Sequence, residues 1–198
     1  MAYTARTWDH LLGGKLAGFT DDQLNTHFAL YKGYVAKMNE IDEKLKTADA
    51  SKANYSYSEY SELKRRESVA YNGTFLHELY FDNLTSNEHT APSEGLEAAL
   101  KEAFGSKESF IADIKGAALS THGWVLLSLD EKHNKLRTSV IISEHHIGLM
   151  PHQKIILALD CWEHAYFVDY GKGPRKAAYL EAFIKVIDWS VVSQRYGK

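Results

Sequence analysis

Hydrophobic and polar positions follow a helical period over two long stretches in the first half of the chain. Apolar or aromatic side chains recur every three to four residues from Leu24 to Leu45, and a second such stripe runs from about Leu63 to Leu84. This spacing places each stripe along one face of a helix. Thr20 and Gln23 have the spacing of a capping box, so the first helix is expected to begin after Thr20. Two long helices joined by the polar stretch 46–60 predict an antiparallel hairpin.

The second half of the chain changes to shorter patterns. Two short amphipathic helices are expected near 96–104 and 109–119, and a longer helical pattern spans about 176–196. Between them stand three runs typical of strands: WVLLSLD, LRTSVIIS and IILALD. Three strands in succession favour an antiparallel sheet.

These patterns predict an α+β fold with two parts. The stretch 85–95 combines Pro92 with serine, asparagine and glycine, so it is the best candidate for a domain boundary. We expect an N-terminal antiparallel helical hairpin domain over 1–90. A C-terminal domain of helices on a three-stranded antiparallel sheet is expected over 91–198.

Composition and charge narrow the class of protein. The chain has 198 residues, of which 44% are hydrophobic and 25% charged, as in ordinary globular proteins. It has no apolar run of about 18 residues and no apolar segment of a secretory signal near its start, so neither a membrane nor export is expected. A net charge of -3 gives no basic surplus for nucleic acid. The single cysteine, Cys161, suits a reducing compartment, and a cytoplasmic location is expected.

Ten histidines are the most suggestive part of the composition, because imidazole is the commonest metal ligand. Asp160 stands at the end of the third strand-like run, and His164 comes four residues later. They can share a helix face or converge across a turn that leaves the sheet, and either geometry lets both reach one ion. His27 and His77 lie along the apolar stripes of the two long helices. Taken singly, each is as well explained by a core histidine or a turn-capping aspartate; together they form a candidate ligand set.

Four segments resemble the iron/manganese superoxide dismutase family. DCWEHAYFVDY resembles the signature around the last two metal ligands, and HELYFDNL resembles the segment that the second ligand opens. GWVLLSL resembles the first strand of the C-terminal half, and TDDQLNTHFALYKGYVAKMN resembles the first helix. The resemblance covers about Thr20 to Trp189. It implies an enzyme that converts superoxide to dioxygen and hydrogen peroxide at one iron or manganese ion, with a solvent molecule as fifth ligand.

The resemblance also assigns roles to individual residues. It implies four metal ligands, three imidazoles and one carboxylate: His27, His77, Asp160 and His164. It implies Tyr34 at the substrate gate and Trp124 and Trp162 as aromatic walls of the site. A homodimer is implied, in which Glu163 of one subunit reaches the ligating histidine of the other.

The chain departs from the family pattern near the first helix. His27 and Tyr34 are seven residues apart, where the family usually has eight, so a local irregularity of the helix is expected. The histidine pair common in this interval is absent. Phe167 replaces the tyrosine that commonly bonds one of those histidines across the dimer interface. The access route is therefore expected to be less polar than usual.

The choice of metal depends on a hydrogen-bond donor near the bound solvent. Many family members use a glutamine there. The helix position that carries it in many iron enzymes, four before His77, is Gly73. In the loop after the second strand, His145 is the better spaced candidate donor and His146 the alternative. A histidine there resembles some iron and metal-promiscuous members, so iron is slightly preferred.

Other functions fit parts of the same pattern. Three imidazoles and a carboxylate can form a closed zinc site without redox chemistry. A metal-binding or structural relative of the family without dismutase activity is the main alternative, and the intact ligand set argues against it. A non-haem oxygenase would use two histidines and one carboxylate, so the third histidine argues against that class.

Overall fold

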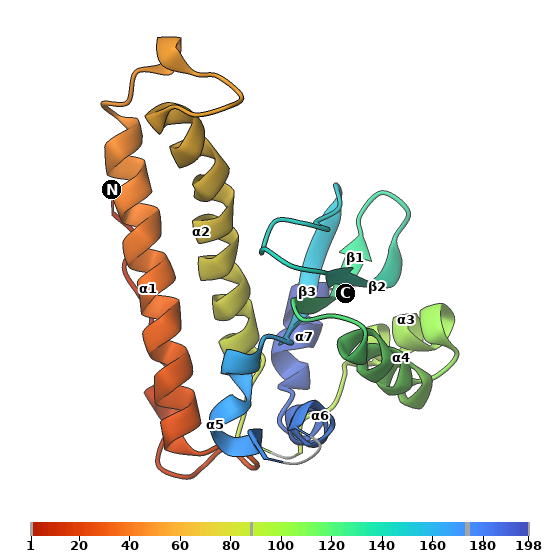
Figure 1. Cartoon of the computed structure of the whole chain (residues 1–198). Helices are drawn as coiled ribbons and strands as arrows, with labels where there is room; N and C mark the ends of the chain where they lie inside the picture. Colours follow the sequence, from red (N-terminus) through yellow and green to blue (C-terminus); the bar gives the residue numbers. More distant parts are fainter. Residues whose placement is uncertain (1, 88, 173–174, 198) are drawn as a thin grey trace.

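The N-terminal half of the chain is a hairpin of two long helices. The computed structural model describes residues 2–87, 89–172 and 175–197. Helices α1 (Asp21–Leu45) and α2 (Glu59–Asp82) pack side by side and run in opposite directions (Figure 1). The short 3-10 helix η1 (Asp9–Leu11) precedes α1, and η2 (Ala50–Lys52) lies in the connection. The predicted hairpin is confirmed.

Helix α1 begins at the predicted cap and continues without a break. Thr20 Oγ1 accepts a hydrogen bond from Gln23 N at 3.2 Å. The irregularity expected between His27 and Tyr34 is wrong, because α1 is one helix through this interval. The physical reason is that seven residues are close to two turns of about 3.6 residues each. A regular helix therefore places both side chains on the same face.

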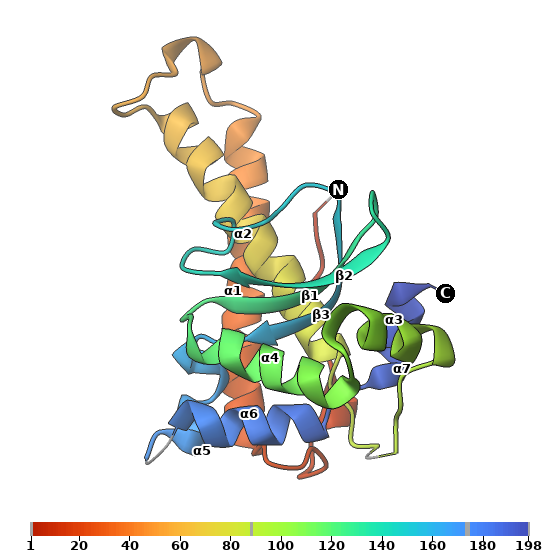
Figure 2. The same cartoon turned by 90° about the vertical axis from the view of Figure 1, so that its right-hand side faces the viewer.

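A three-stranded antiparallel sheet forms the centre of the second half. Strand β1 (Trp124–Asp130) pairs with both β2 (Lys135–Ile141) and β3 (Gln153–Asp160), giving the order β2-β1-β3. Helices α3 (Glu94–Phe104) and α4 (Lys107–Leu119) contact β2, whereas α2 contacts β3. The sheet thus lies between the hairpin and this helix pair (Figure 1, Figure 2). The predicted α+β fold is confirmed.

The C-terminal segment differs from the single helix expected over 176–196. It forms α6 (Arg175–Lys185) and α7 (Trp189–Tyr196). The Asp188 side chain accepts hydrogen bonds from Ser190 N and Val191 N and so caps α7. Backbone bonds also join the break to the end of the hairpin, from Thr85 N to Val186 O at 2.9 Å and from Asp188 N to Asn83 O at 2.6 Å. These long-range bonds replace the helical ones.

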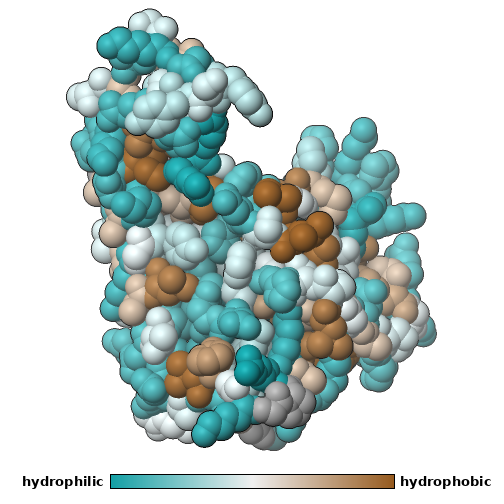
Figure 3. All heavy atoms as spheres, viewed as in Figure 1, coloured by the Kyte–Doolittle hydropathy of each residue, from teal (hydrophilic) through white to brown (hydrophobic). Residues whose placement is uncertain are grey.

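Both halves contribute to one hydrophobic core. It includes Trp8 and Phe81 from the first half and Trp124, Leu157 and Phe183 from the second. A core that both halves share does not mark a domain boundary, so the division into two domains at residue 90 stays a prediction. The face in Figure 3 is largely polar, with apolar residues in small separate areas. Among the described residues, no helix is both long and apolar enough to cross a membrane.

Candidate metal centre

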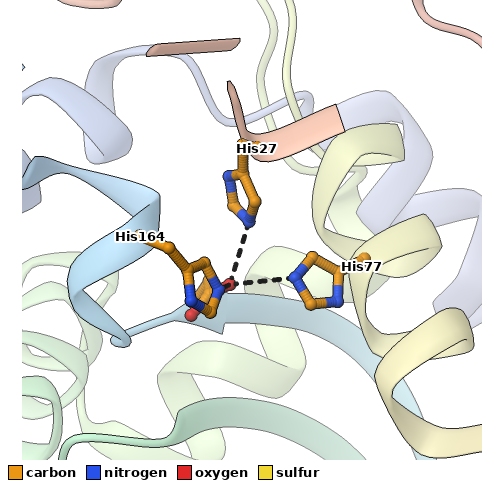
Figure 4. A group of neighbouring side chains, drawn as sticks. His27, His77 and His164 are labelled. Carbon is orange, nitrogen blue, oxygen red and sulfur yellow. Dashed lines mark hydrogen bonds and ion pairs between the residues drawn. The ribbon is translucent and has the colours of Figure 1, made fainter. Parts of the chain in front are cut away.

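Four side chains with metal-ligating atoms converge where the hairpin meets the end of β3. His27 comes from α1 and His77 from α2. Asp160 ends β3, and His164 lies in η3 (Glu163–Ala165), a 3-10 helix of one turn. Their ligand atoms all lie within 4.8 Å of one another. Figure 4 shows the three histidine rings pointing toward one another. Of the two geometries left open for Asp160 and His164, the structure has the turn that leaves the sheet.

The three imidazoles surround one carboxylate oxygen. The distances from Nε2 to Asp160 Oδ2 are 3.1 Å for His27, 3.5 Å for His77 and 3.0 Å for His164. The other oxygen, Oδ1, accepts a hydrogen bond from Trp162 N at 2.9 Å. The carboxylate is therefore anchored on one side by the backbone and faces the imidazoles with the other.

The proton position on His77 shows that this cluster fits a cation. His77 Nδ1 lies 2.5 Å from Gly73 O, and a carbonyl can only accept, so Nδ1 carries the ring proton. In the neutral ring, Nε2 then carries a lone pair and no proton. It is buried without a hydrogen-bond partner among the described residues, and it faces Asp160 Oδ2. Two buried acceptors that face each other are unfavourable, and a metal ion between them would satisfy both.

Burial sets the protonation of the ligand atoms. It lowers the pKa of His27, against the opposing effect of Asp160, and lowers the pKa of His77 well below its usual value. Burial alone would raise the pKa of Asp160, but attraction and hydrogen bonds from His164 and His27 bring it below its ordinary range. At neutral pH the cluster therefore contains a carboxylate and neutral imidazoles at His27 and His77, which is the state that binds a metal.

A row of hydrogen-bonded side chains lies beside His77. Trp124 Nε1 donates to His145 Nδ1 at 2.8 Å, and His145 Nε2 lies 2.7 Å from Tyr34 Oη. Because an indole N–H can only donate, the proton of the neutral His145 ring is on Nε2 and is donated to Tyr34. The Tyr34 and His77 rings are 5.4 Å apart between centroids. The Tyr34 hydroxyl can then donate its own proton to a further acceptor.

The remaining predicted residues lie close to this cluster. Trp162 stacks with His164 at a centroid distance of 6.3 Å. Between the two loop candidates, His145 makes the contacts with Trp124 and Tyr34. His146 Nδ1 is buried and has no hydrogen-bond partner in the described part of the chain. Glu163 is exposed, next to His164.

Sequence patterns did not identify two residues that hydrogen-bond to the backbone of the site. Tyr179 Oη donates to Asp160 O at 2.8 Å, but in the sequence Tyr179 is only one apolar position of the last helical pattern. Gln23 Nε2 donates to His164 O at 2.7 Å. A signal for Gln23 was available, since it is a polar residue one helical turn before His27.

The fold and the cluster define a class of metalloprotein, in which a helical hairpin and an α/β unit share one mononuclear site. The family model for the C-terminal domain of iron/manganese superoxide dismutases matches residues 92–195. An iron superoxide dismutase of Aquifex pyrophilus is 42% identical, over 96% of this chain and 90% of that protein. A manganese superoxide dismutase of Haloferax volcanii is 34% identical, over 86% and 82% respectively. The chain belongs to the iron/manganese superoxide dismutase family, as its motifs indicate.

Proposed function

We propose that His27, His77, Asp160 and His164 bind the one iron or manganese ion at which this superoxide dismutase acts. The observation that carries the ligand assignment is the buried lone pair of His77 Nε2, which faces the Asp160 carboxylate. When bound, the ion would supply one-electron redox chemistry for the overall conversion of two superoxide ions and two protons into one dioxygen and one hydrogen peroxide.

The protein's own part in the reaction is to supply and orient protons. We propose Tyr34 as the side chain that donates a hydrogen bond to substrate. Burial raises the pKa of Tyr34, so its hydroxyl stays protonated at neutral pH. His145 donates to the Tyr34 oxygen and Trp124 fixes the His145 ring, which directs the Tyr34 proton away from His145. Trp124 and Trp162 are proposed as walls that limit access of water to the site.

Iron is the metal that we propose. Two iron enzymes from Aquifex species are 42% and 41% identical to this chain, compared with 34% for the manganese enzymes of Haloferax volcanii. The buried His145, rather than a glutamine on α2, stands beside Tyr34. Metal analysis of protein from its native source, with activity after reconstitution with each metal, tests this choice. Higher activity with manganese would overturn it.

We further propose a cytoplasmic homodimer. Glu163 is exposed directly beside His164, which places its carboxylate where a second subunit can use it. Phe167 lies on the same segment and is 51% exposed. Aromatic side chains of this kind are enriched at protein–protein interfaces. The one cysteine, Cys161, is buried and free, which suits a reducing compartment.

The ligand assignment is tested by His77→Ala. We expect the variant to lose both its metal and its dismutase activity, because one of four ligands is gone. Metal content and activity are measured on the same sample, with circular dichroism to confirm folding. The exposed His10→Ala in η1 is the matched control and should behave as the parent. Near-stoichiometric metal with retained activity in His77→Ala would reject the assignment. Bound metal without activity in the parent would favour the non-catalytic alternative.

A further inference from the structure

Of the four proposed ligands, His164 has the least support from regular structure. The chain leaves β3 at Asp160, forms the single turn η3, and then begins the separate short helix α5 (Phe167–Tyr170). No side chain caps η3. The His164 side chain is 25% exposed, whereas that of His77 is fully buried. Apart from the hydrogen bond from Trp162 N to Asp160 Oδ1, the direction of His164 therefore depends on contacts from outside its own turn.

The side chain of Gln23 reaches this turn from α1. Its Nε2 donates to His164 O at 2.7 Å, and its Oε1 accepts from Val168 N at 3.0 Å. Gln23 is only 1% exposed, so neither hydrogen bond is readily replaced by water. It lies one helical turn before His27. One amide thus connects the helix of one proposed ligand to the backbone of another.

The two groups that Gln23 joins are those that an α-helix would pair directly. His164 O and Val168 N are four residues apart, which is the spacing of helical backbone bonds. Instead the amide stands between them, and Tyr166, with φ -147° and ψ -5°, separates the two helical pieces. The Gln23 side chain therefore spans the interruption of helical hydrogen bonding between η3 and α5.

A second pair of hydrogen bonds joins the same segments. Thr20 N and Thr20 Oγ1 donate to the two carboxylate oxygens of Asp169, at 2.8 and 2.5 Å. These bonds do not involve Gln23, so the segment can stay docked on α1 when the amide is removed. A Gln23 variant therefore tests the shape of the ligand turn itself.

We propose that Gln23 is a positioning residue for the metal ligand His164, an inference that rests on the proposed ligand set. Without the amide, His164 O and Val168 N can pair with each other and wind η3 and α5 into one helix. That change rotates the His164 ring away from Asp160. The expected consequence is a distorted metal site in a protein that still folds.

The test compares Gln23→Met with Gln194→Met in the iron-loaded enzyme. Methionine keeps the length of the side chain and removes both hydrogen bonds, and Gln194 is exposed on α7. Electron paramagnetic resonance of the ferric form reports the ligand geometry, and the rate of iron loss to a chelator reports retention. We expect Gln23→Met to change the spectrum and to weaken iron binding about 10- to 100-fold, as loss of groups that orient ligands commonly does. Gln194→Met should match the parent.

Gln23→Leu keeps the test decisive if Gln23→Met does not fold. Leucine has neither a donor for His164 O nor an acceptor for Val168 N, whereas a buried glutamic acid could regain the lost bond by protonation. We expect an altered ferric spectrum here too. A parent-like spectrum and iron release in either folded variant, even with lowered thermal stability, would make Gln23 merely structural and overturn the proposal. Iron retention with a parent-like spectrum in His77→Ala would instead reject the ligand set, so the two failures are distinguishable.

Discussion

At the scale of single residues, His145 differs from a glutamine in the number of protons that it can share. Its Nδ1 is occupied by the proton of Trp124 Nε1, and burial lowers its pKa, so Nε2 carries its one proton. That proton is donated to Tyr34 Oη. A glutamine in the same place could accept from Trp124 with Oε1, donate to Tyr34, and retain a second N–H. The substitution therefore adds a donor near the metal ligands without removing an existing contact.

We expect His145→Gln to keep its metal and to shift the reduction potential. An additional donor stabilises one oxidation state of the site over the other, and a tenfold change in that equilibrium corresponds to about 59 mV for one electron. Redox titration of the iron-loaded and manganese-loaded enzymes measures the effect, which should differ between the two metals. A shift in the control His146→Gln, with none in His145→Gln, would transfer the role to His146. Unchanged potentials in both would leave the two residues without an influence on the metal.

At the scale of elements, the packing of α1 on α2 places Tyr34 over a glycine. A Cβ at position 73 would lie 2.6 Å from Tyr34 Cδ1, closer than real Cβ atoms approach their neighbours. The same glycine supplies the carbonyl that fixes the proton on His77. The absence of a side chain at Gly73 therefore leaves room for the Tyr34 ring, which any larger residue there would displace.

Gly73→Ala should destabilise the protein and move Tyr34, although alanine is the better helix former. In an open helical position the same change stabilises by about 0.5–1 kcal/mol, whereas overpacking costs about 1–3 kcal/mol. Gly116→Ala is the matched control, because nothing lies within 4 Å of a Cβ there on α4. Denaturant unfolding of the metal-free proteins gives both free energies of unfolding. Equal stabilisation by the two substitutions would show that α1 and α2 separate easily at Tyr34.

At the scale of the whole molecule, the proposed ion joins the two halves of the chain. His27 and His77 belong to the hairpin, whereas Asp160 ends strand β3 and His164 follows it. Metal bound by this set would therefore stabilise the packing of one half against the other. The proposed dimer extends the same logic, because Glu163 would orient a ligand in a second subunit.

Glu163→Ala is expected to weaken the dimer and the metal site together. One carboxylate is proposed to cross the interface and fix the ring of a ligating histidine, so its loss acts on both. Sedimentation and metal content are measured on the same sample, with the exposed Glu102→Ala on α3 as control. A stable dimer with full metal occupancy in Glu163→Ala would place this carboxylate outside the interface.

Local patterns in the chain are enough to predict its elements and its candidate ligands. Apolar periodicity predicted α1, α2 and the three strands, because each pattern reports a backbone preference that is local in the chain. The cap at Thr20 is local for the same reason. The ligand candidates His27, His77, Asp160 and His164 were recognisable from short motifs, and the structure brings all four together.

How these elements meet depends on contacts between residues that are far apart in the chain. The break between α6 and α7 depends on bonds to residues 83–85, about a hundred positions away. That His145 rather than His146 contacts Trp124 and Tyr34 is likewise a long-range feature, and so is the hydrogen bond from Gln23 to a turn 141 residues further along the chain. Periodicity contains no information on such pairings, because they form between groups that only folding brings within hydrogen-bond distance.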